Sequence, residues 1–381
     1  MKRLLIAPDS FKGCMTAMEA AEAIECGWRS VMGDTWSYHK VPMADGGEGT
    51  TQSLHDALHG TWITTTVTGP LGESVDAAYS LAFGGTTAII EMAAASGLNL
   101  LTPETLNPLV ATTYGTGELV RDALDRGVTR LIIGIGGSAT NDGGAGFLQA
   151  LGVKLCDAQG HELPFGGAAL QQLAYIDMTH LDPRLAQIDI EVACDVTNPL
   201  LGSSGATAVY GAQKGVTEEM FPILEQALTH YHAMIQRDVG KDVAMIPGAG
   251  AAGGLGTALL ACLPVTLRSG VDIVLDVTNF QHYALNCDLV VTGEGRIDGQ
   301  TAFGKTPVGV AQAAKHYHKP VIAVAGTIGD GYEAVFDHGI DAVYSLSSGP
   351  MSLAEALAQG QDALTRWSEN MARFYQITSK R

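Results

Sequence analysis

The chain has 381 residues, 46% of them hydrophobic and 16% charged, a composition that fits a folded soluble protein and excludes a disordered one. Its formal net charge of −18 argues against nucleic-acid and anionic-membrane partners, because both need a basic protein surface. A chain of this length exceeds what one hydrophobic core usually covers, so we expect two domains.

The first residues predict a β-strand and not a secretory signal. An apolar run at Arg3–Ala7 stops at Pro8 and Asp9, too early for a signal peptide. The six cysteines are widely spaced and include no C-x-x-C pair, which favours reduced thiols in a cytoplasmic protein. A charge-free run at Val243–Leu267 is interrupted by two prolines and is rich in glycine and alanine, so we expect no membrane span.

A helix follows at about Thr16–Val31, with Thr16 as its N-cap and Glu19 as the capping-box partner. A second strand is predicted near Tyr38–Pro42. Residues Thr64–Met92 then alternate as antiparallel strands do, with threonine-rich and glycine-rich turns. A helix, a strand and another helix come next, at Gly117–Arg126, Leu131–Ile135 and Gly143–Leu151.

The C-terminal part alternates strands and helices. The expected elements are a strand at Asp288–Thr292, a helix at Pro307–Tyr317, and strands at Val321–Ala325 and Ala342–Leu346. Such alternation predicts a mostly parallel sheet covered on both faces. We therefore predict an α/β fold in which residues 1–70 and 281–381 form a Rossmann-like parallel-sheet domain, with a second mixed α/β domain, residues 71–280, inserted.

The 47 glycines gather in a few loops, of which Gly134–Gly146 is the most informative. This loop follows an apolar strand and opens an apolar helix, so its N–H groups and the helix N-terminus can converge on an anion. Side chains within it can add hydrogen bonds, and Asp142 can hold a metal ion. The alternative is a tight turn in which Asn141 or Asp142 caps the helix.

The segment Gly293–Thr306 follows the Asp288–Thr292 strand and contains a formal Walker A match, which begins at Gly299. We interpret the match as coincidental, because Gly293–Asp298 separate the strand from the first motif glycine. The segment also carries two cations and two acids that can bind phosphate and Mg²⁺, namely Arg296, Lys305, Glu294 and Asp298. A salt-bridged surface loop is less favoured, because sites in such sheets lie at the carboxyl ends of strands.

Two N-terminal loops also follow strands. Asp9, Ser10 and Lys12 end the first strand, and Asp45 and Glu48 follow the second. Their acids can act as metal ligands, as a base or as turn caps, and Lys12 can contact a carboxylate or a phosphate.

The segment Ala193–Leu200 carries Asp195 as a candidate base, and further along Lys214 is a candidate anion contact. An Asx-turn before Pro199 explains Asp195 equally well. A literal dinucleotide fingerprint at Gly248–Gly253 is weak by itself, and we expect close helix packing or a second anion contact there.

Six strings resemble the type I glycerate kinase family. They are APDSFKG (7–13), PMADGGEGT (42–50), GIGGSATNDGGAG (134–146), CDVTNPLLG (194–202), GAGAAGGLG (248–256) and TGEGRIDGQTAFGKTPVGVA (292–311). They occur in the family's order and span nearly the whole chain. The resemblance implies ATP-dependent phosphorylation of D-glycerate at its 2-hydroxyl, and a Rossmann-like domain from both chain ends. Cys14 and Ala212 depart from the family's usual residues without touching a charged position.

We therefore predict an ATP- and Mg²⁺-dependent glycerate 2-kinase. The candidate catalytic residues are Asp195, Asp9, Lys12 and Arg296. The candidate nucleotide-binding residues are Gly136, Gly137, Ser138, Thr140, Asn141 and Lys305. The candidate substrate-binding residues are Ser10, Asp45 and Asn198, and the candidate metal ligands are Asp142, Glu294 and Asp298.

Three other functions stay open from the sequence: an NAD-dependent dehydrogenase of a small hydroxy acid, a kinase that phosphorylates the 3-hydroxyl, and a protein that senses metabolites without turnover. We expect small-molecule ligands and neither nucleic acid nor membrane as a partner. The oligomeric state stays open, a homodimer included.

Overall fold

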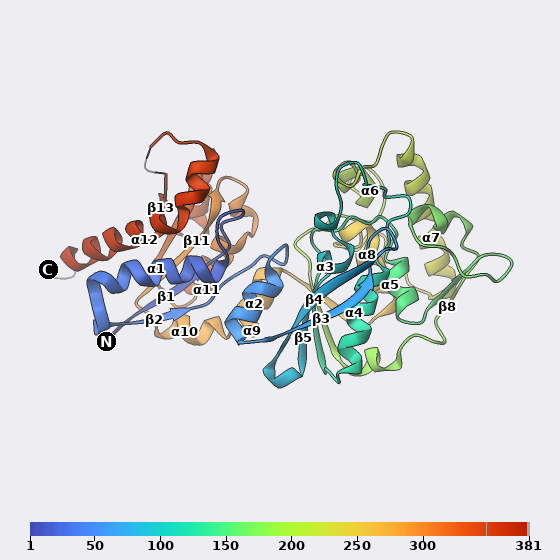
Figure 1. The fold of residues 1–381 in the computed structure, drawn as a ribbon, viewed down its shortest axis with the longest axis horizontal. Coiled ribbons are helices and arrows are strands. Elements are labelled where there is room, and N and C mark those ends of the chain that lie inside the picture. The colour runs from blue at the N-terminus through green and yellow to red at the C-terminus, as the bar shows by residue number, and fades with distance from the viewer. Residues whose placement is uncertain (348, 379–381) are drawn as a thin grey trace. The chain divides into compact units, whose positions relative to one another are not determined.

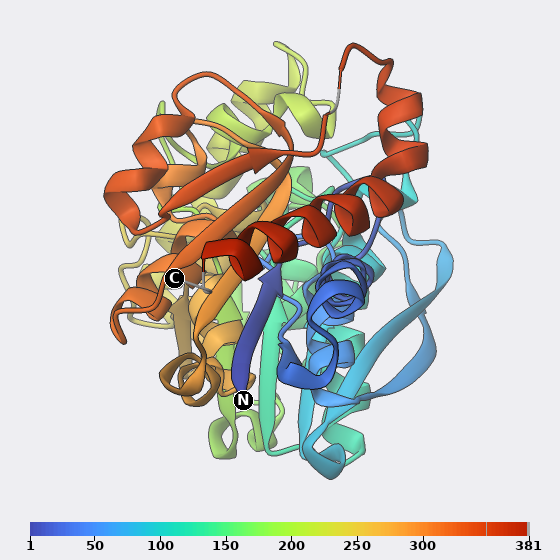
Figure 2. The same ribbon diagram turned by 90° about the vertical axis from the view of Figure 1, so that its left-hand side faces the viewer.

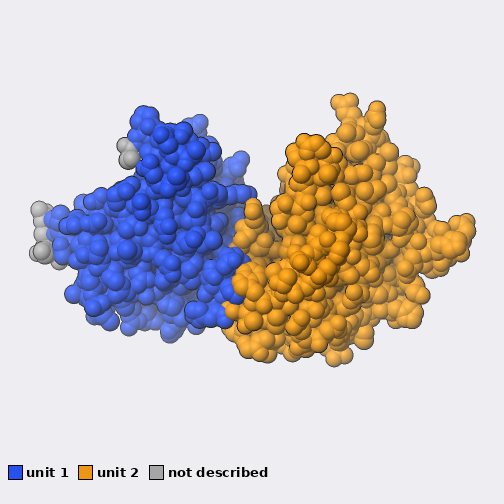
Figure 3. Space-filling view, in the orientation of Figure 1, with its two compact units in different colours: residues 1–45, 52–59, 271–381 blue, residues 46–51, 60–270 orange. Residues whose placement is uncertain are grey.

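The computed structural model describes residues 1–347 and 349–378, and the chain forms two compact units (Figure 3). Unit 1 consists of Met1–Asp45, Gln52–His59 and Val271–Arg381, and unit 2 of Gly46–Thr51 and Gly60–Gly270. The predicted domain limits, 1–70 with 281–381 and 71–280, stay a prediction, since compact packing does not show which stretch folds by itself.

Unit 1 contains a five-stranded parallel sheet built from both ends of the chain, in the order β13-β12-β11-β1-β2. Its strands are β1 (Lys2–Pro8), β2 (Trp36–Lys40), β11 (Leu289–Ile297), β12 (Val321–Ile328) and β13 (Ala342–Ser345). Figure 2 shows the blue strand β1 beside the orange strands of the C-terminal part. The predicted Rossmann-like parallel sheet is confirmed. Its winding changes direction between β1 and β11, the position where open parallel sheets bind ligands.

Two long helices of unit 1, α1 (Ala17–Met32) and α12 (Leu353–Thr378), pack against each other (Figure 1). The predicted capping box is present, because Thr16 and Glu19 each accept a hydrogen bond from the other's backbone N–H. Close approach depends on Gly27, where an added Cβ would lie 2.2 Å from the carbonyl oxygen of Thr365. Apolar side chains of both helices share one core with alternate residues of β1 and β11, so both helices cover the same face of the sheet. The remaining helices are α9 (Gly270–Val277), α10 (Phe280–Asn286) and α11 (Thr306–Lys315), and α2 (Thr50–Leu58) begins at the boundary of the two units.

Unit 2 contains a six-stranded mixed sheet in the order β10-β9-β6-β5-β4-β3. The strands are β3 (Thr61–Thr68), β4 (Ser74–Ala82), β5 (Thr87–Glu91), β6 (Arg130–Gly134), β9 (Asp189–Ala193) and β10 (Val265–Arg268). Strands β3, β4 and β5 are antiparallel, as the alternation of residues 64–92 predicts, and β5, β6, β9 and β10 are parallel. The predicted mixed α/β insertion is therefore confirmed.

The helices of unit 2 pack around one apolar core that includes residues of β5, β6 and β9. They are α3 (Ala93–Ser96), α4 (Tyr114–Asp125), α5 (Ala145–Ala150), α6 (Ala206–Tyr210), α7 (Met220–Asp238) and α8 (Ala251–Cys262), and a small second sheet pairs β7 (Lys154–Cys156) with β8 (Tyr175–Asp177). Across the described residues of both units, none of the helices combines the length and the apolar character needed to cross a membrane.

Candidate functional site

Carboxylates gather in unit 1 at the carboxyl ends of β1 and β11. Asp9 directly follows β1, and Glu294 lies in β11 one residue beyond Gly293, which pairs with Pro8. The negative charge of Asp45, in the loop after β2, acts on both acids. The pairing of β1 with β11 on one side and with β2 on the other thus brings together acids that are far apart in the sequence.

Two threonine hydroxyls hold these carboxylates in place. Thr306, the first residue of α11, donates from Oγ1 to Oδ2 of Asp9 at 2.5 Å. Thr301 donates from Oγ1 to Oε1 of Glu294 at 2.7 Å, and the backbone N–H of Ser10 donates to Oδ1 of Asp9 at 2.6 Å. Thr301, which precedes α11, and Thr306, its first residue, therefore fix the orientation of the two acids.

Both acids ionise closer to neutral pH than ordinary carboxylates do. Burial raises the pKa of Asp9 to about 6, against the opposing hydrogen bond from Thr306 and with help from the charge of Asp45. Burial likewise raises the pKa of Glu294 to about 7, although Thr301 and the charge of Lys305 act in the other direction. Acids shifted in this way and aligned at a strand end are typical of functional sites.

These two shifts predict an acid limb in the pH profile of kcat/KM. Each acid is ionised above its pKa and protonated below it. Because these two pKa values are raised to about 6 and about 7, activity should fall as the pH drops through the range from about 7 to about 6. Protonation of a single group lowers the rate about tenfold per pH unit. Because two acids must be ionised here, the fall in rate should be steeper than that. Initial rates at limiting substrate across this range test it. A profile that stays flat down to about pH 5 would contradict the assignment of these acids to the site.

The Walker-like segment has a different context from the one that the sequence indicates. Strand β11 runs to Ile297, beyond its predicted end at Thr292, because its backbone pairs with β12 as far as Ile297 and Ile328. Gly299 therefore comes two residues after the strand, and Thr306 begins α11. The strand–loop–helix order that a Walker A sequence needs is present. The interpretation of the match as coincidental relied on a longer gap, and this reason is wrong.

The cations of this segment differ in their surroundings. Lys305 is the N-cap residue of α11 and is close enough to Glu294 to lower the pKa of that acid. The side chain of Arg296 is 64% exposed and donates from Nε to Oδ2 of Asp298 at 3.0 Å. Asp298 also accepts the backbone N–H of Gln300 at 3.0 Å. Arg296 and Asp298 therefore form a pair, whereas Lys305 is a cation near the carboxylate of Glu294.

In unit 2, the glycine-rich loop after β6 is partly accessible and partly buried. Gly137 is exposed and Gly136 half-buried, whereas Ser138 is 6% exposed. Thr140 and Asn141 have no exposed surface, and Asn141 donates from Nδ2 to Oγ1 of Thr207 at 3.1 Å. Among the predicted nucleotide-binding residues of this loop, only the first three thus reach its surface.

Asp142 is a buried residue of the same loop and accepts four hydrogen bonds. Its Oδ2 accepts from N and Oγ1 of Thr113, both at 2.8 Å, and from the N–H of Gly146 at 3.2 Å. Its Oδ1 accepts from the N–H of Gly144 at 3.1 Å. The N-cap residue of α5 is Gly144, so Asp142 holds the turn before this helix and satisfies one N–H of its first turn, that of Gly146, without being its N-cap.

The dinucleotide-like glycine run packs against the same loop. Gly253 has a φ of +65°, and a Cβ there would lie 2.0 Å from the carbonyl oxygen of Thr140. Gly254 contacts Gly143 in the same way, and the N–H of Gly143 donates to the oxygen of Gly253 at 3.0 Å. Close packing, one of the two expected roles of this run, is what the structure shows.

The acid at the end of β9 and the following loop carry local contacts. Asp195 is exposed, and its Oδ1 accepts the N–H of Gly270 at 3.1 Å. Asn198 donates from Nδ2 to the oxygen of Ser204 at 2.9 Å and accepts the hydroxyl of Tyr210 at 2.7 Å. Both polar groups of the Asn198 side chain therefore hold its own loop.

Sequence reasoning missed Glu91 and Thr306. Glu91 ends β5 and accepts the backbone N–H groups of Gly49 at 3.4 Å and of Thr51 at 2.6 Å, and burial raises its pKa. An acid that directly follows an apolar strand is the signal that could have identified it. Thr306 carried no such signal beyond its place in the Walker match.

The predicted metal ligands belong to different units, Glu294 and Asp298 to unit 1 and Asp142 to unit 2. In residues 1–347 and 349–378, no group of three or more His, Cys, Asp or Glu side chains is arranged to hold a metal ion.

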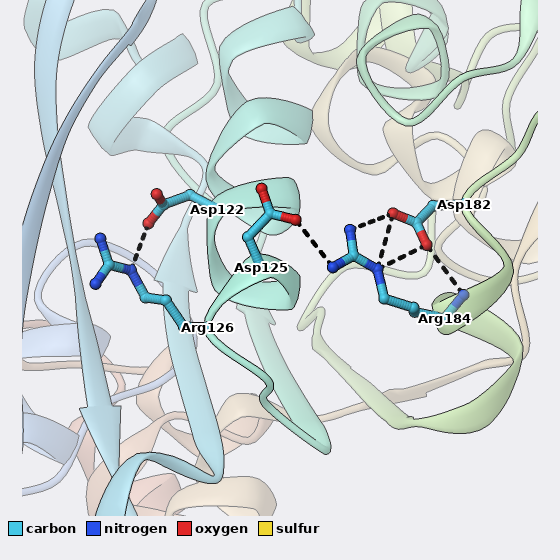
Figure 4. Close-up of polar contacts among 5 residues, drawn as sticks. All are labelled: Asp122, Asp125, Arg126, Asp182 and Arg184. Atoms are coloured by element: carbon cyan, nitrogen blue, oxygen red, sulfur yellow. Dashed lines mark hydrogen bonds and ion pairs between the residues drawn. The ribbon is translucent and has the colours of Figure 1, made fainter.

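A hollow of about 450 Å³ in unit 2 is lined by Arg121, His180 and Arg184. Its cations are compensated, because Arg184 pairs with Asp125 at 2.9 Å and with Asp182 at 2.6 Å (Figure 4). The neighbouring ion pair between Arg126 and Asp122, at 2.9 Å, repeats this pattern. Paired surface charges of this kind indicate a solvated face and not an anion site.

Both units contain parallel strands; unit 1 carries clustered acids at strand ends, and unit 2 carries a partly accessible glycine-rich loop. These features are typical of α/β proteins that bind small anions or nucleotides at strand ends. The chain belongs to the glycerate kinase family, whose model matches residues 4–376.

Individual relatives are similar over almost their whole length. A glycerate kinase of Halalkalibacterium halodurans is 54% identical over 98% of both chains, and the glycerate 2-kinase of Escherichia coli is 51% identical over 97% of both. The crystal structure of a protein from Salmonella typhimurium LT2, assigned as glycerate kinase 2, has a TM-score of 0.92 and 48% identity and covers 100% of both chains.

Proposed function

We propose that the protein transfers the γ-phosphoryl group of ATP to the 2-hydroxyl of D-glycerate and releases 2-phosphoglycerate and ADP. The alcohol oxygen forms a bond to the γ-phosphorus, the bond from that phosphorus to the ADP oxygen breaks, and the hydroxyl proton passes to a base. The observation that carries the proposal is the meeting of Asp9, Glu294 and Lys305 at the change of winding in the sheet of unit 1. The 51% identity to a relative named glycerate 2-kinase supports this substrate and position.

Asp9 is the base in this proposal. Its pKa of about 6 leaves it ionised at neutral pH and still able to take up a proton, and the hydroxyl of Thr306 fixes its orientation. Asp195, the other candidate, is exposed and follows β9 in unit 2. Asp9, by contrast, follows β1 in unit 1, where Glu294 and Lys305 also lie. We therefore prefer Asp9 over Asp195.

In this proposal two carboxylates of unit 1 would hold a magnesium ion. Glu294 and Asp45 supply the carboxylate oxygens that Mg²⁺ prefers, and the raised pKa of Glu294 reflects burial together with like charges that a cation would relieve. Bound Mg²⁺ would supply positive charge for the phosphate oxygens. Asp298 is engaged by Arg296 and Asp142 by four protein donors, so neither enters this proposal as a ligand.

Lys305 neutralises phosphate charge at the start of α11 in this proposal, and Lys305→Met is expected to lower kcat/KM by about tenfold or more. The matched control is Lys315→Met at the other end of the same helix, where the lysine pairs with Asp341 at 2.6 Å. The control should stay within about twofold of the wild type, since a surface ion pair contributes little. Steady-state kinetics of both variants decide the point. Equal effects of the two substitutions would remove Lys305 from the site.

The reaction itself is tested by coupling the product to enolase without phosphoglycerate mutase. A signal that needs both ATP and glycerate identifies 2-phosphoglycerate. ADP release without an enolase signal would favour phosphorylation of the 3-hydroxyl. A change of NADH fluorescence on mixing, with no ADP release, would favour the dehydrogenase alternative.

A further inference from the structure

Lys214 is a buried lysine of unit 2 that the reaction described above does not use. It ends a short 3₁₀-helix, Ala212–Lys214, and its side chain is 1% exposed. Gly215 follows with a φ of +88°, and a Cβ there would lie 2.8 Å from Cβ of Leu106. Burial of a lysine is costly unless its donors are satisfied, so the contacts of its ammonium group indicate what it does.

The ammonium group of Lys214 binds two atoms of the glycine-rich loop. Nζ donates to Oγ of Ser138 and to the carbonyl oxygen of Thr140, both at 2.7 Å. In its charged form the ammonium group of Lys214 has no lone pair, so the Ser138 oxygen then accepts in this contact. The Ser138 hydroxyl hydrogen then points away from Lys214 and is available to an acceptor other than this lysine.

The backbone around Ser138 is held on its other side. The N–H of Leu98 donates to the oxygen of Gly137 at 2.9 Å, and the N–H of Ala139 donates to the oxygen of Ser96 at 2.9 Å. Gly136 and Gly137 next to this serine are accessible. The hydroxyl hydrogen therefore belongs to a rigid stretch of loop whose neighbouring residues reach the surface.

We propose that Lys214 is a positioning residue, which makes the Ser138 hydroxyl a donor to an anionic oxygen bound at Gly136–Ser138. This inference rests on the proposed function, because it assigns that oxygen to one of the two substrates. The shared chemistry is an oxygen of a phosphate or of a carboxylate. Donors fixed before the ligand arrives bind charge well, because they need no reorganisation.

Electrostatics support this role. The chain carries a formal charge of −18, so an anion needs local positive potential to bind. A buried ammonium acts over a short distance in a medium of low dielectric, where its potential is little screened. Burial lowers the pKa of Lys214 to about 7 against the opposing charge of Asp142, so the ammonium form on which this role depends predominates below about pH 7.

The test is a double-mutant cycle of Ser138→Ala and Lys214→Met, with affinities for ATP, ADP and glycerate measured by calorimetry. Each single variant should weaken the same ligand by about tenfold, the range of a hydrogen bond to a charged group. The double variant should be no weaker than the weaker-binding single one, since both remove the same donor. Weakened ATP and ADP binding identifies a phosphate oxygen, and weakened glycerate binding alone identifies the carboxylate.

Tyr79→Phe is the matched control, since it deletes a buried hydroxyl of unit 2 that donates to Asp122 at 2.7 Å. It should leave all three affinities unchanged. If Lys214→Met does not fold, Lys214→Gln replaces it in the cycle, because its amide oxygen competes for the Ser138 hydrogen and should weaken the same ligand.

Two outcomes overturn the inference: wild-type affinities in Ser138→Ala, or effects of the two substitutions that multiply. Failure of the proposed function has a different signature. Wild-type protein would then give no enolase signal with ATP and glycerate, whatever the cycle shows for binding.

Discussion

Asp9→Asn is expected to lower kcat by about a hundredfold or more, while the affinity for ATP changes little. Asparagine keeps the shape of the side chain, and its amide oxygen can still accept the hydroxyl of Thr306. It cannot take up the proton of the substrate hydroxyl, and a positioned general base contributes about 10²–10⁴-fold to such a step. The loss should therefore fall on kcat and not on ligand binding.

The same substitution changes the electrostatics of its neighbour. The charge of Asp9 helps to raise the pKa of Glu294, so its removal should lower that pKa and move the remaining acid limb of the pH profile to lower pH. A structural disturbance alone would not produce this directional shift. The pH profile of the residual activity is thus a second measurement on the same variant.

The matched variant is Asp195→Asn, which removes the other candidate base. We expect it to retain most of the wild-type kcat, because Asp195 is exposed and bonded to the backbone of Gly270. The reverse result, in which Asp195→Asn is inactive and Asp9→Asn is not, would transfer the role of base to Asp195.

Local sequence signals predicted the local structure of this chain well. The capping box of Thr16 and Glu19 formed, because it involves only neighbouring residues. The alternation of residues 64–92 became antiparallel strands, because period-two patterns correspond to one buried face. The end of β11 at Ile297 could not be predicted in this way, since its last residues are strand only through pairing with β12.

For the candidate sites, too, contacts between residues far apart in the sequence could not be predicted from local patterns. Asp9 and Glu294 are neighbours because β1 pairs with β11. These two strands come from opposite ends of the chain, so no local sequence pattern reveals their pairing. Thr140 and Asn141 looked like ligand-binding residues, because polar side chains in a glycine-rich loop usually face a ligand. The structure buries both: Gly253 packs on the Thr140 backbone and Asn141 donates to Thr207, while Oγ1 of Thr140 and Oδ1 of Asn141 have no hydrogen-bond partner among the described residues. The assignment of Thr140 and Asn141 to a nucleotide site therefore stays a prediction.

Asp142→Ala is expected to lower the free energy of unfolding by about 3–5 kcal/mol, the range for removing one partner of a buried charged network. The substitution leaves the N–H groups of Thr113, Gly144 and Gly146 without their carboxylate acceptor in a buried place. It also removes the charge that favours the ammonium form of Lys214. Urea denaturation followed by circular dichroism measures the change.

Asp157→Ala provides the matched control, because Asp157 also accepts backbone N–H groups, those of Gln159 and His161 at 2.9 Å, but in an exposed turn. Water can replace its hydrogen bonds, so we expect a loss of about 1 kcal/mol or less. The comparison also separates the two roles considered for Asp142. A residue that holds the turn should give the same loss with and without Mg²⁺, whereas a metal ligand should give a loss that appears only when Mg²⁺ stabilises the wild type. A magnesium-dependent difference would return Asp142 to the metal site, and its absence would leave the carboxylate as the anchor of the glycine-rich loop.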